Sequence, residues 1–192
     1  MFDPGEVLSW ARFTRAGAFA EYAVTREDTL ALKPSALSHE QAAAIPVSCL
    51  TAWQVLKDRL ASPGKRVMVN GASGGVGVFA VEIAKALGAH VTAVCSDRHL
   101  AAVANLGADE VIDYRQKNIR TLSQRFDIIY DVAVTTSFCR CAHLLEKDGV
   151  FISNIATPGS VLASGLYPLL PSLGFRKRNT FAFVVPSGQD LQ

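Results

Sequence analysis

A glycine-rich turn constrains the fold of this chain more than any other part of its sequence. The turn, Gly71-Ala72-Ser73-Gly74-Gly75-Val76-Gly77, follows a short apolar run at 66–70 and opens a helical pattern at 76–87. A turn of this kind between a strand and a helix is typical of a dinucleotide-binding unit. Of the three glycines in the G-x-G-x-x-G spacing, the first is replaced by alanine, whereas the second and third, Gly74 and Gly77, are present.

Each remaining glycine has a physical role in such a turn. Gly74 would let the backbone approach a pyrophosphate, and Gly77 would let the helix pack closely on the strand. The start of the helix adds free N–H groups and a positive potential, which favour phosphate. The alternative is a tight strand–helix turn that holds no ligand. A P-loop is excluded, because no Lys-Ser/Thr pair closes the glycine run.

The rest of the chain alternates between short apolar runs and helical patterns. Strands are expected at 66–70, 91–95, 110–112, 126–132, 150–154 and 180–185, and helices at 76–87, 100–106, 117–124 and 136–145. This alternation predicts a doubly wound, mostly parallel six-stranded sheet of the α/β class. Upstream, strands are expected at 18–24 and 29–33. A helix is expected to begin after Ser38, which has capping-box spacing to Gln41, and to be interrupted by Pro46. A second helix is expected at 51–60.

Composition excludes several classes of function. Hydrophobic residues make up 49% of the 192 residues and charged residues 19%, which predicts a folded chain. The net charge of +2 gives no support to nucleic-acid binding. Four cysteines do not make a disulfide scaffold at this length. The uncharged stretch 149–175 contains three prolines, so no membrane span is expected, and without a visible secretory signal we expect a cytoplasmic protein.

Several segments together resemble one family. Residues 70–77 and 79–89 resemble the medium-chain dehydrogenase/reductase superfamily, and most closely its quinone-oxidoreductase-like branch, which lacks the catalytic zinc. The segments 17–22, 50–53, 106–114 and 126–131 resemble the same family. The resemblance implies a Rossmann-fold NAD(P)-binding domain at 35–192, preceded at 1–34 by a short remnant of a GroES-like β-barrel catalytic domain. Most of the substrate domain would then be absent from this chain.

The resemblance also implies which residues bind the cofactor. NAD enzymes carry Asp or Glu at the end of the second strand, a position that in family register is Ser96. Arg98 could pair with the 2′-phosphate of NADPH, and Tyr114 is similar to a family tyrosine beside that phosphate. Asp97 is an alternative acid, yet the charges favour NADPH over NADH. The full set of implied cofactor-binding residues is Thr51, Ser73, Gly74, Gly75, Val76, Gly77, Ser96, Arg98, Tyr114, Asn154, Ile155 and Ala156.

No metal site is expected. Cys139 and Cys141 lie at i and i+2 of an expected helix and therefore point in different directions. Four tetrahedral ligands are also lacking, so we expect no zinc. No residue is assigned as the catalytic acid.

The expected function is an NADPH-dependent oxidoreductase that reduces a quinone, an enone or a carbonyl by hydride transfer. The alternative is a nucleotide-binding or scaffold module without turnover of its own. The substrate would be a small molecule bound together with the missing catalytic domain, so this chain alone should turn over poorly or not at all. The apolar run at 180–185 would form an unprotected sheet edge. A homodimer through that edge is therefore expected.

Overall fold

The computed structural model describes residues 7–9, 25–60, 62–155, 178–182 and 184–192. The strand expected at 18–24 and the site residue Ala156 lie outside these residues. No helix in the described part of the chain has the length and apolarity needed to cross a membrane.

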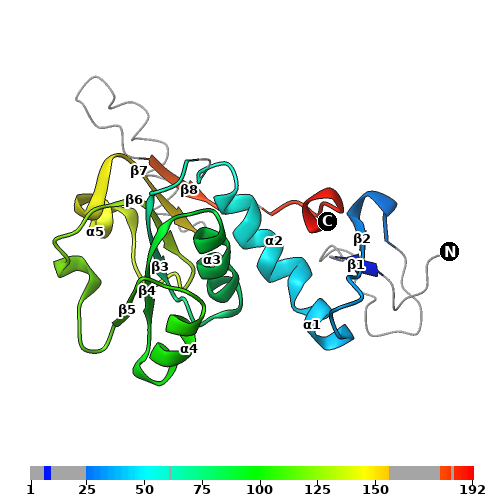
Figure 1. Ribbon diagram of the computed structural model, residues 1–192. Helices are drawn as coiled ribbons and strands as arrows, with labels where there is room; N and C mark the ends of the chain where they lie inside the picture. Colours follow the sequence, from blue (N-terminus) through cyan, green and yellow to red (C-terminus); the bar gives the residue numbers. More distant parts are fainter. Residues whose placement is uncertain (1–6, 10–24, 61, 156–177, 183) are drawn as a thin grey trace.

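A six-stranded parallel sheet forms the centre of the molecule (Figure 1). Its order is β5-β4-β3-β6-β7-β8. The strands are β3 (Arg66–Asn70), β4 (His90–Cys95), β5 (Glu110–Asp113), β6 (Phe126–Asp131), β7 (Leu145–Ser153) and β8 (Arg178–Phe181). All five neighbouring pairs are parallel. The expected doubly wound α/β fold is confirmed. The strand order reverses between β3 and β6, which is the topological switch point where such sheets bind ligands.

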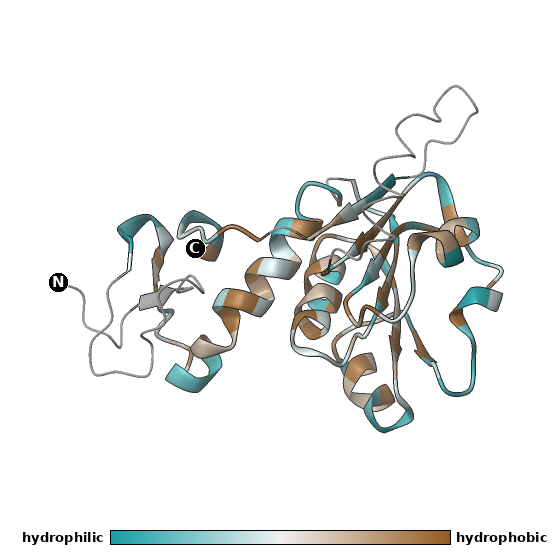
Figure 2. Cartoon of the chain, turned by 180° about the vertical axis from the view of Figure 1, so that it is seen from behind, coloured by the Kyte–Doolittle hydropathy of each residue, from teal (hydrophilic) through white to brown (hydrophobic). Residues whose placement is uncertain are grey.

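Helices cover both faces of the sheet (Figure 1). One core packs α2 (Ile45–Leu56), α3 (Gly75–Ala86) and α4 (Leu100–Asn105) on the sheet. The opposite core joins α5 (Phe138–Cys141) and the 3-10 turn η4 (Ala142–Leu144) to the other face, where Phe138 meets Phe151 edge-on at 6.3 Å. Because both faces are covered, the inner stretches 67–69 of β3, 91–95 of β4 and 128–130 of β6 are buried and largely apolar (Figure 2).

The N-terminal region and the chain end meet beside α2. A two-stranded antiparallel sheet pairs β1 (Val7–Ser9) with β2 (Leu30–Leu32), and η1 (Glu27–Thr29) precedes β2. Helix α1 (His39–Ala43) leads into α2. The last turn, η7 (Gln189–Leu191), packs on both α2 and β2 (Figure 1). The division of the chain at residue 34 into barrel remnant and cofactor domain stays a prediction.

The predicted helix at 117–124 is wrong. The segment contains only the 3-10 turn η3 (Ile119–Thr121), and the side chain of Asn118 caps it by accepting a hydrogen bond from the backbone of Arg120. Among residues 114–125 only Leu122 is buried. With a single buried side chain the segment has no apolar stripe to pack on the sheet, so an isolated helix of this length would be unstable.

Several other boundaries differ from the sequence expectation. The predicted helix 136–145 shortens to α5 and η4, because Leu145 already pairs with Phe126 of β6. The strand predicted at 180–185 is β8, which spans Arg178–Phe181 instead. Its partner β7 ends at Ser153, which lies opposite Phe181. Pro46 does not lie between two helices but in the first turn of α2, where its missing N–H costs nothing. Helix α2 ends at Leu56 rather than at residue 60.

Candidate cofactor site

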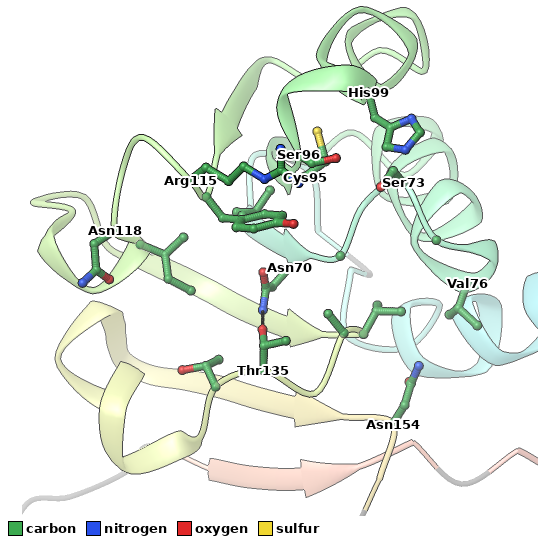
Figure 3. Close-up of a pocket in the computed structure, with 18 of the residues that line it drawn as sticks. Asn70, Ser73, Val76, Cys95, Ser96, His99, Arg115, Asn118, Thr135 and Asn154 are labelled. Atoms are coloured by element: carbon green, nitrogen blue, oxygen red, sulfur yellow. Dashed lines mark hydrogen bonds between the residues drawn. The ribbon is translucent and has the colours of Figure 1, made fainter.

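A cavity of about 1180 Å³ lies at the carboxyl ends of the central strands. It is larger than the roughly 300–1,000 Å³ of pockets for drug-sized ligands. Its wall includes the glycine turn, the start of α3, the ends of β3, β4 and β7, and the loops after β5 and β6 (Figure 3). The cavity therefore lies across the switch point of the sheet, where the fold binds ligands.

The glycine turn is held by backbone contacts that leave no room for a side chain at Gly71 and Gly77 but leave space at Gly74. Gly71 has a φ of +90°, and its N–H and that of Ala72 both donate to the carbonyl of Val94 at 3.0 Å. A Cβ on Gly77 would lie 2.1 Å from the carbonyl oxygen of Gly71, so α3 packs directly against the turn. A Cβ on Gly74 would meet nothing nearer than 3.4 Å. Gly77 therefore serves packing, whereas Gly74 lines the open cavity.

The start of α3 faces the same cavity. Gly74 is its N-cap residue and makes no side-chain cap, and Gly75 and Val76 follow it in the wall. A helix start without a side-chain cap presents its first N–H groups and its positive dipole end to a ligand. A phosphate fits this part of the wall.

The structure brings together most, but not all, of the residues implied by the sequence. Those that line the cavity are Ser73, Gly74, Gly75, Val76, Ser96, Tyr114 and Asn154. Thr51 is buried at 7% exposure, and its hydroxyl donates to the carbonyl of Val47 at 2.5 Å. Arg98 is exposed in η2 (Asp97–His99) and is not among the lining residues. Ile155 is 58% exposed and also lies outside the wall.

Sequence reasoning missed three cavity arginines. They are Arg115, Arg120 and Arg140, whereas none of the described lining residues is Asp or Glu. Arg115 directly follows Tyr114 at the end of β5, so its place at a strand end could have been a signal. Arg120 lies in the loop after β5 and Arg140 in the short helix α5, and the course of these two segments brings both side chains to the cavity wall. No local sequence pattern indicates that course.

Arg115 is fixed by two neighbours. Its Nη1 lies 3.0 Å from Oδ1 of Asp97, and its guanidinium lies 6.0 Å from the centre of the Tyr114 ring. The pKa of Arg115 is raised, first by its contact with Tyr114 and then by the charge of Asp97. Asp97, the alternative acid considered for the cofactor ribose, is therefore already paired with a cation.

A buried carboxylate behind the cavity wall is hydrogen-bonded to two residues of that wall. Asp131 is fully buried and accepts hydrogen bonds from Nδ2 of Asn70 at 2.7 Å and from the backbone of Thr136 at 3.0 Å. Asn70 also donates to Oγ1 of Thr135 at 2.8 Å. Both amide hydrogens of Asn70 are thus engaged, and its Oδ1 faces the cavity as an acceptor (Figure 3).

The described residues contain no group of three His, Cys, Asp or Glu side chains that could hold a metal ion. Cys139 is exposed and Cys141 is buried, as expected for side chains two positions apart on a helix. The expectation of no zinc stays a prediction.

Comparison with known proteins identifies the family. The sequence model described as zinc-binding dehydrogenase matches residues 75–187. The chain belongs to this family. Members named as quinone oxidoreductases are among its relatives, which confirms the resemblance to the quinone-oxidoreductase-like branch of the medium-chain dehydrogenases/reductases.

Two curated relatives illustrate the match. The human protein "NAD(P)H oxidoreductase RTN4IP1, mitochondrial" is 42% identical over an alignment of 170 positions, which covers 82% of this chain and 42% of that protein. The chloroplastic quinone-oxidoreductase QR1 of Triphysaria versicolor is 31% identical over 201 residues, covering 99% of this chain and 60% of that one. The chain therefore spans about two to three fifths of the length of these relatives.

Solved structures agree with the fold. The quinone oxidoreductase of Coxiella burnetii superimposes with a TM-score of 0.74 at 25% identity and covers 86% of this chain and 50% of its own. The quinone oxidoreductase of Thermus thermophilus, solved also in complex with NADPH, gives a TM-score of 0.63 at 30% identity over 80% of this chain and 49% of its own.

Proposed function

We propose that this chain binds NADPH and orients it for hydride transfer to a quinone, an enone or a carbonyl. The observation that carries the proposal is the cavity at the switch point, which combines a glycine turn and a helix start with three arginines and no described acidic side chain. The names of the relatives, NAD(P)H oxidoreductase and quinone oxidoreductase, support it.

The residues of the cavity fit a dinucleotide in one direction. Gly74, Gly75 and Val76 would hold the pyrophosphate against the start of α3. Ser96, at the end of β4, would face the adenosine ribose, and the other nucleoside would then extend toward β6 and β7. The nicotinamide supplies the hydride chemistry when it is bound, whereas this chain binds it, orients it and excludes water.

The choice of NADPH over NADH rests on charge at the end of β4. Ser96 puts no carboxylate there, and Asp97 is paired with Arg115. We assign recognition of the 2′-phosphate to Arg115 with Tyr114, because both line the cavity, whereas the expected Arg98 does not. Arginine suits this role because its charged N–H donors match phosphate geometry.

Two alanine variants test the assignment. Arg115→Ala removes the cation and also releases the charge of Asp97, so NADPH affinity should fall about tenfold or more while NADH affinity holds or improves. Arg98→Ala is the matched control, and we expect both affinities to stay near those of the unchanged chain. Titration of cofactor fluorescence measures all four dissociation constants. Equal losses of NADPH and NADH in Arg115→Ala would contradict this role, and a selective loss in Arg98→Ala would move it to Arg98.

Turnover is a separate question from binding. Oxidation of NADPH, followed by absorbance with a soluble quinone, tests whether the 192-residue chain reduces substrate. We expect slow turnover or none, because the chain spans only about two to three fifths of the length of its relatives. Binding without turnover supports the alternative of a nucleotide-binding module, and failure to bind NADPH supports a scaffold. The cytoplasmic location stays a prediction, and the names of several relatives place those proteins in mitochondria or chloroplasts.

A further inference from the structure

A tyrosine hydroxyl lies buried beside the cavity. Tyr130 of β6 has no exposed surface, and in the sheet it stands between Val69 of β3 and Ile152 of β7. Its ring belongs to the core under α2 and α3. Its hydroxyl donates to Oδ1 of Asn154 at 2.7 Å. Asn154 comes directly after β7 and lines the cavity, so the core and the candidate site touch at this hydrogen bond.

The buried hydroxyl determines which way the Asn154 amide faces. Burial raises the pKa of Tyr130 well above the ordinary phenol value, so the hydroxyl keeps its proton and needs an acceptor. Oδ1 of Asn154 is that acceptor. If the amide were turned over, its Nδ2 would meet the phenol oxygen and the phenol proton would lose its partner, which is unfavourable for a buried donor. Nδ2 of Asn154 therefore points into the cavity (Figure 3).

The position of Asn154 indicates what this donor meets. The glycine turn follows β3 in the middle of the sheet, and Ser96 follows β4 on one side of it. Asn154 follows β7, on the opposite side. A dinucleotide whose pyrophosphate lies on the turn and whose adenosine lies over β4 places its nicotinamide nucleoside over β6 and β7. That nucleoside carries acceptor oxygens on its ribose and its carboxamide.

We propose that Tyr130 is a positioning residue, which holds Asn154 so that Nδ2 donates a hydrogen bond to an oxygen of the nicotinamide nucleoside. The proposal rests on the proposed function, because it assumes NADPH in the cavity. Tyr130 itself does not touch the cofactor. It acts through one hydrogen bond, and its loss should leave the adenosine half of the site unchanged.

A comparison of two ligands separates this role from a general structural one. The ligands are NADPH and 2′,5′-ADP, which carries the phosphorylated adenosine half without the nicotinamide. Tyr130→Phe keeps the ring and removes the hydroxyl, and we expect NADPH to bind about three- to tenfold more weakly while the affinity for 2′,5′-ADP does not change. Asn154→Asp keeps the acceptor for Tyr130 but replaces the donor with a carboxylate oxygen. We expect it to weaken NADPH at least as much and to spare 2′,5′-ADP.

A double-mutant cycle shows whether Tyr130 acts through Asn154. In the Asn154→Ala background, Tyr130→Phe should cause no further loss of NADPH affinity. Isothermal titration at constant pH measures each constant, and the thermal midpoint of each variant reports its folding. Equal losses for both ligands, or independent effects of the two substitutions, would overturn the inference while the proposed function stands. If the unchanged chain binds neither ligand, the proposed function fails and this inference fails with it.

Discussion

Gly77→Ala should destabilise the fold through a contact inside the backbone. The new Cβ would lie 2.1 Å from the carbonyl oxygen of Gly71 and 2.8 Å from Cα of Ala72, whereas ordinary contacts between carbon atoms begin near 3.5 Å. Neither atom belongs to a flexible side chain, so α3 or the turn must move. We take the upper end of the usual overpacking cost, about 3 kcal/mol. The higher helix propensity of alanine relative to glycine offsets about 1 kcal/mol of this loss in folding free energy.

The net loss is therefore about 2 kcal/mol, which corresponds to a fall in melting temperature of roughly 4–8 °C for a chain of this size. Circular dichroism at 222 nm during heating measures it. Because the turn itself shifts, NADPH affinity should fall together with stability. A melting temperature equal to that of the unchanged chain would refute the reasoning, since it would mean that α3 and the turn tolerate a methyl group between them.

Gly74→Ala is the matched control for this prediction. Gly74 has an ordinary φ of −82°, and its new Cβ would meet only the carbonyl oxygen of Gly71 at 3.4 Å. Exchange of glycine for alanine at an N-cap costs about 0.5–1 kcal/mol. This variant should therefore melt within a few degrees of the unchanged chain. Its methyl group would occupy the cavity wall, so we expect weaker NADPH binding with the fold preserved.

Two further predictions concern the C-terminal part of the chain. Burial raises the pKa of Asp190, but hydrogen bonds from Lys57 and Gln54 outweigh this and lower it below the ordinary value. The stabilisation is thus present above the unfolded carboxyl pKa of about 4 and is lost as the pH falls through the lower folded value. Asp190→Asn should therefore melt lower than the unchanged chain at pH 7, and the difference should shrink as the pH falls below about 4. A difference that stays constant as the pH falls through this acid range would mean that the carboxylate is not its source. We also propose the homodimer, through the outer edge of β8 (Arg178–Phe181), since β8 is the outermost strand of the sheet, whereas the backbone of Val185 is hydrogen-bonded to Gln54. Light scattering at micromolar concentration should give a dimer that Thr180→Lys dissociates, and a monomer would refute the pairing.

The core strands could be predicted because their signals are local. The apolar runs of β3, β4, β5 and β6 agree with the sequence expectation to within two residues, since strands covered on both faces need no alternation. The capping box is equally local: Gln41 N donates to Oγ of Ser38 at 3.2 Å, and Ser38 N donates to Oε1 of Gln41 at 2.9 Å. The glycine turn was identified for the same reason, because strand, turn and helix follow one another in the sequence.

Features that depend on a distant partner could not be predicted in this way. The end of β8 coincides with the end of its partner β7. The segment 117–124 forms only the turn η3, because a helix there would have a single buried side chain to hold it against the sheet. The hydrogen bond between Tyr130 and Asn154 joins β6 to the residue that follows β7, so no spacing along the chain indicates it. The sequence placed Asn154 at the site because it ends the strand expected at 150–154, but did not connect it to the core.

Arg98 and Arg115 show why sequence spacing within one segment does not identify the cation near the end of β4. Arg98 was chosen because it follows Ser96 by two residues, but η2 begins at Asp97 and leaves Arg98 exposed outside the cavity wall. In the parallel register Cys95 lies opposite Asp113, so the residues after β4 lie beside those after β5. Arg115 therefore reaches Asp97 across the two strand ends and faces the cavity. In a parallel sheet the carboxyl ends of neighbouring strands lie at the same edge. A cation that binds a phosphate near the end of β4 can therefore come from the residues after β5 as well as from those after β4.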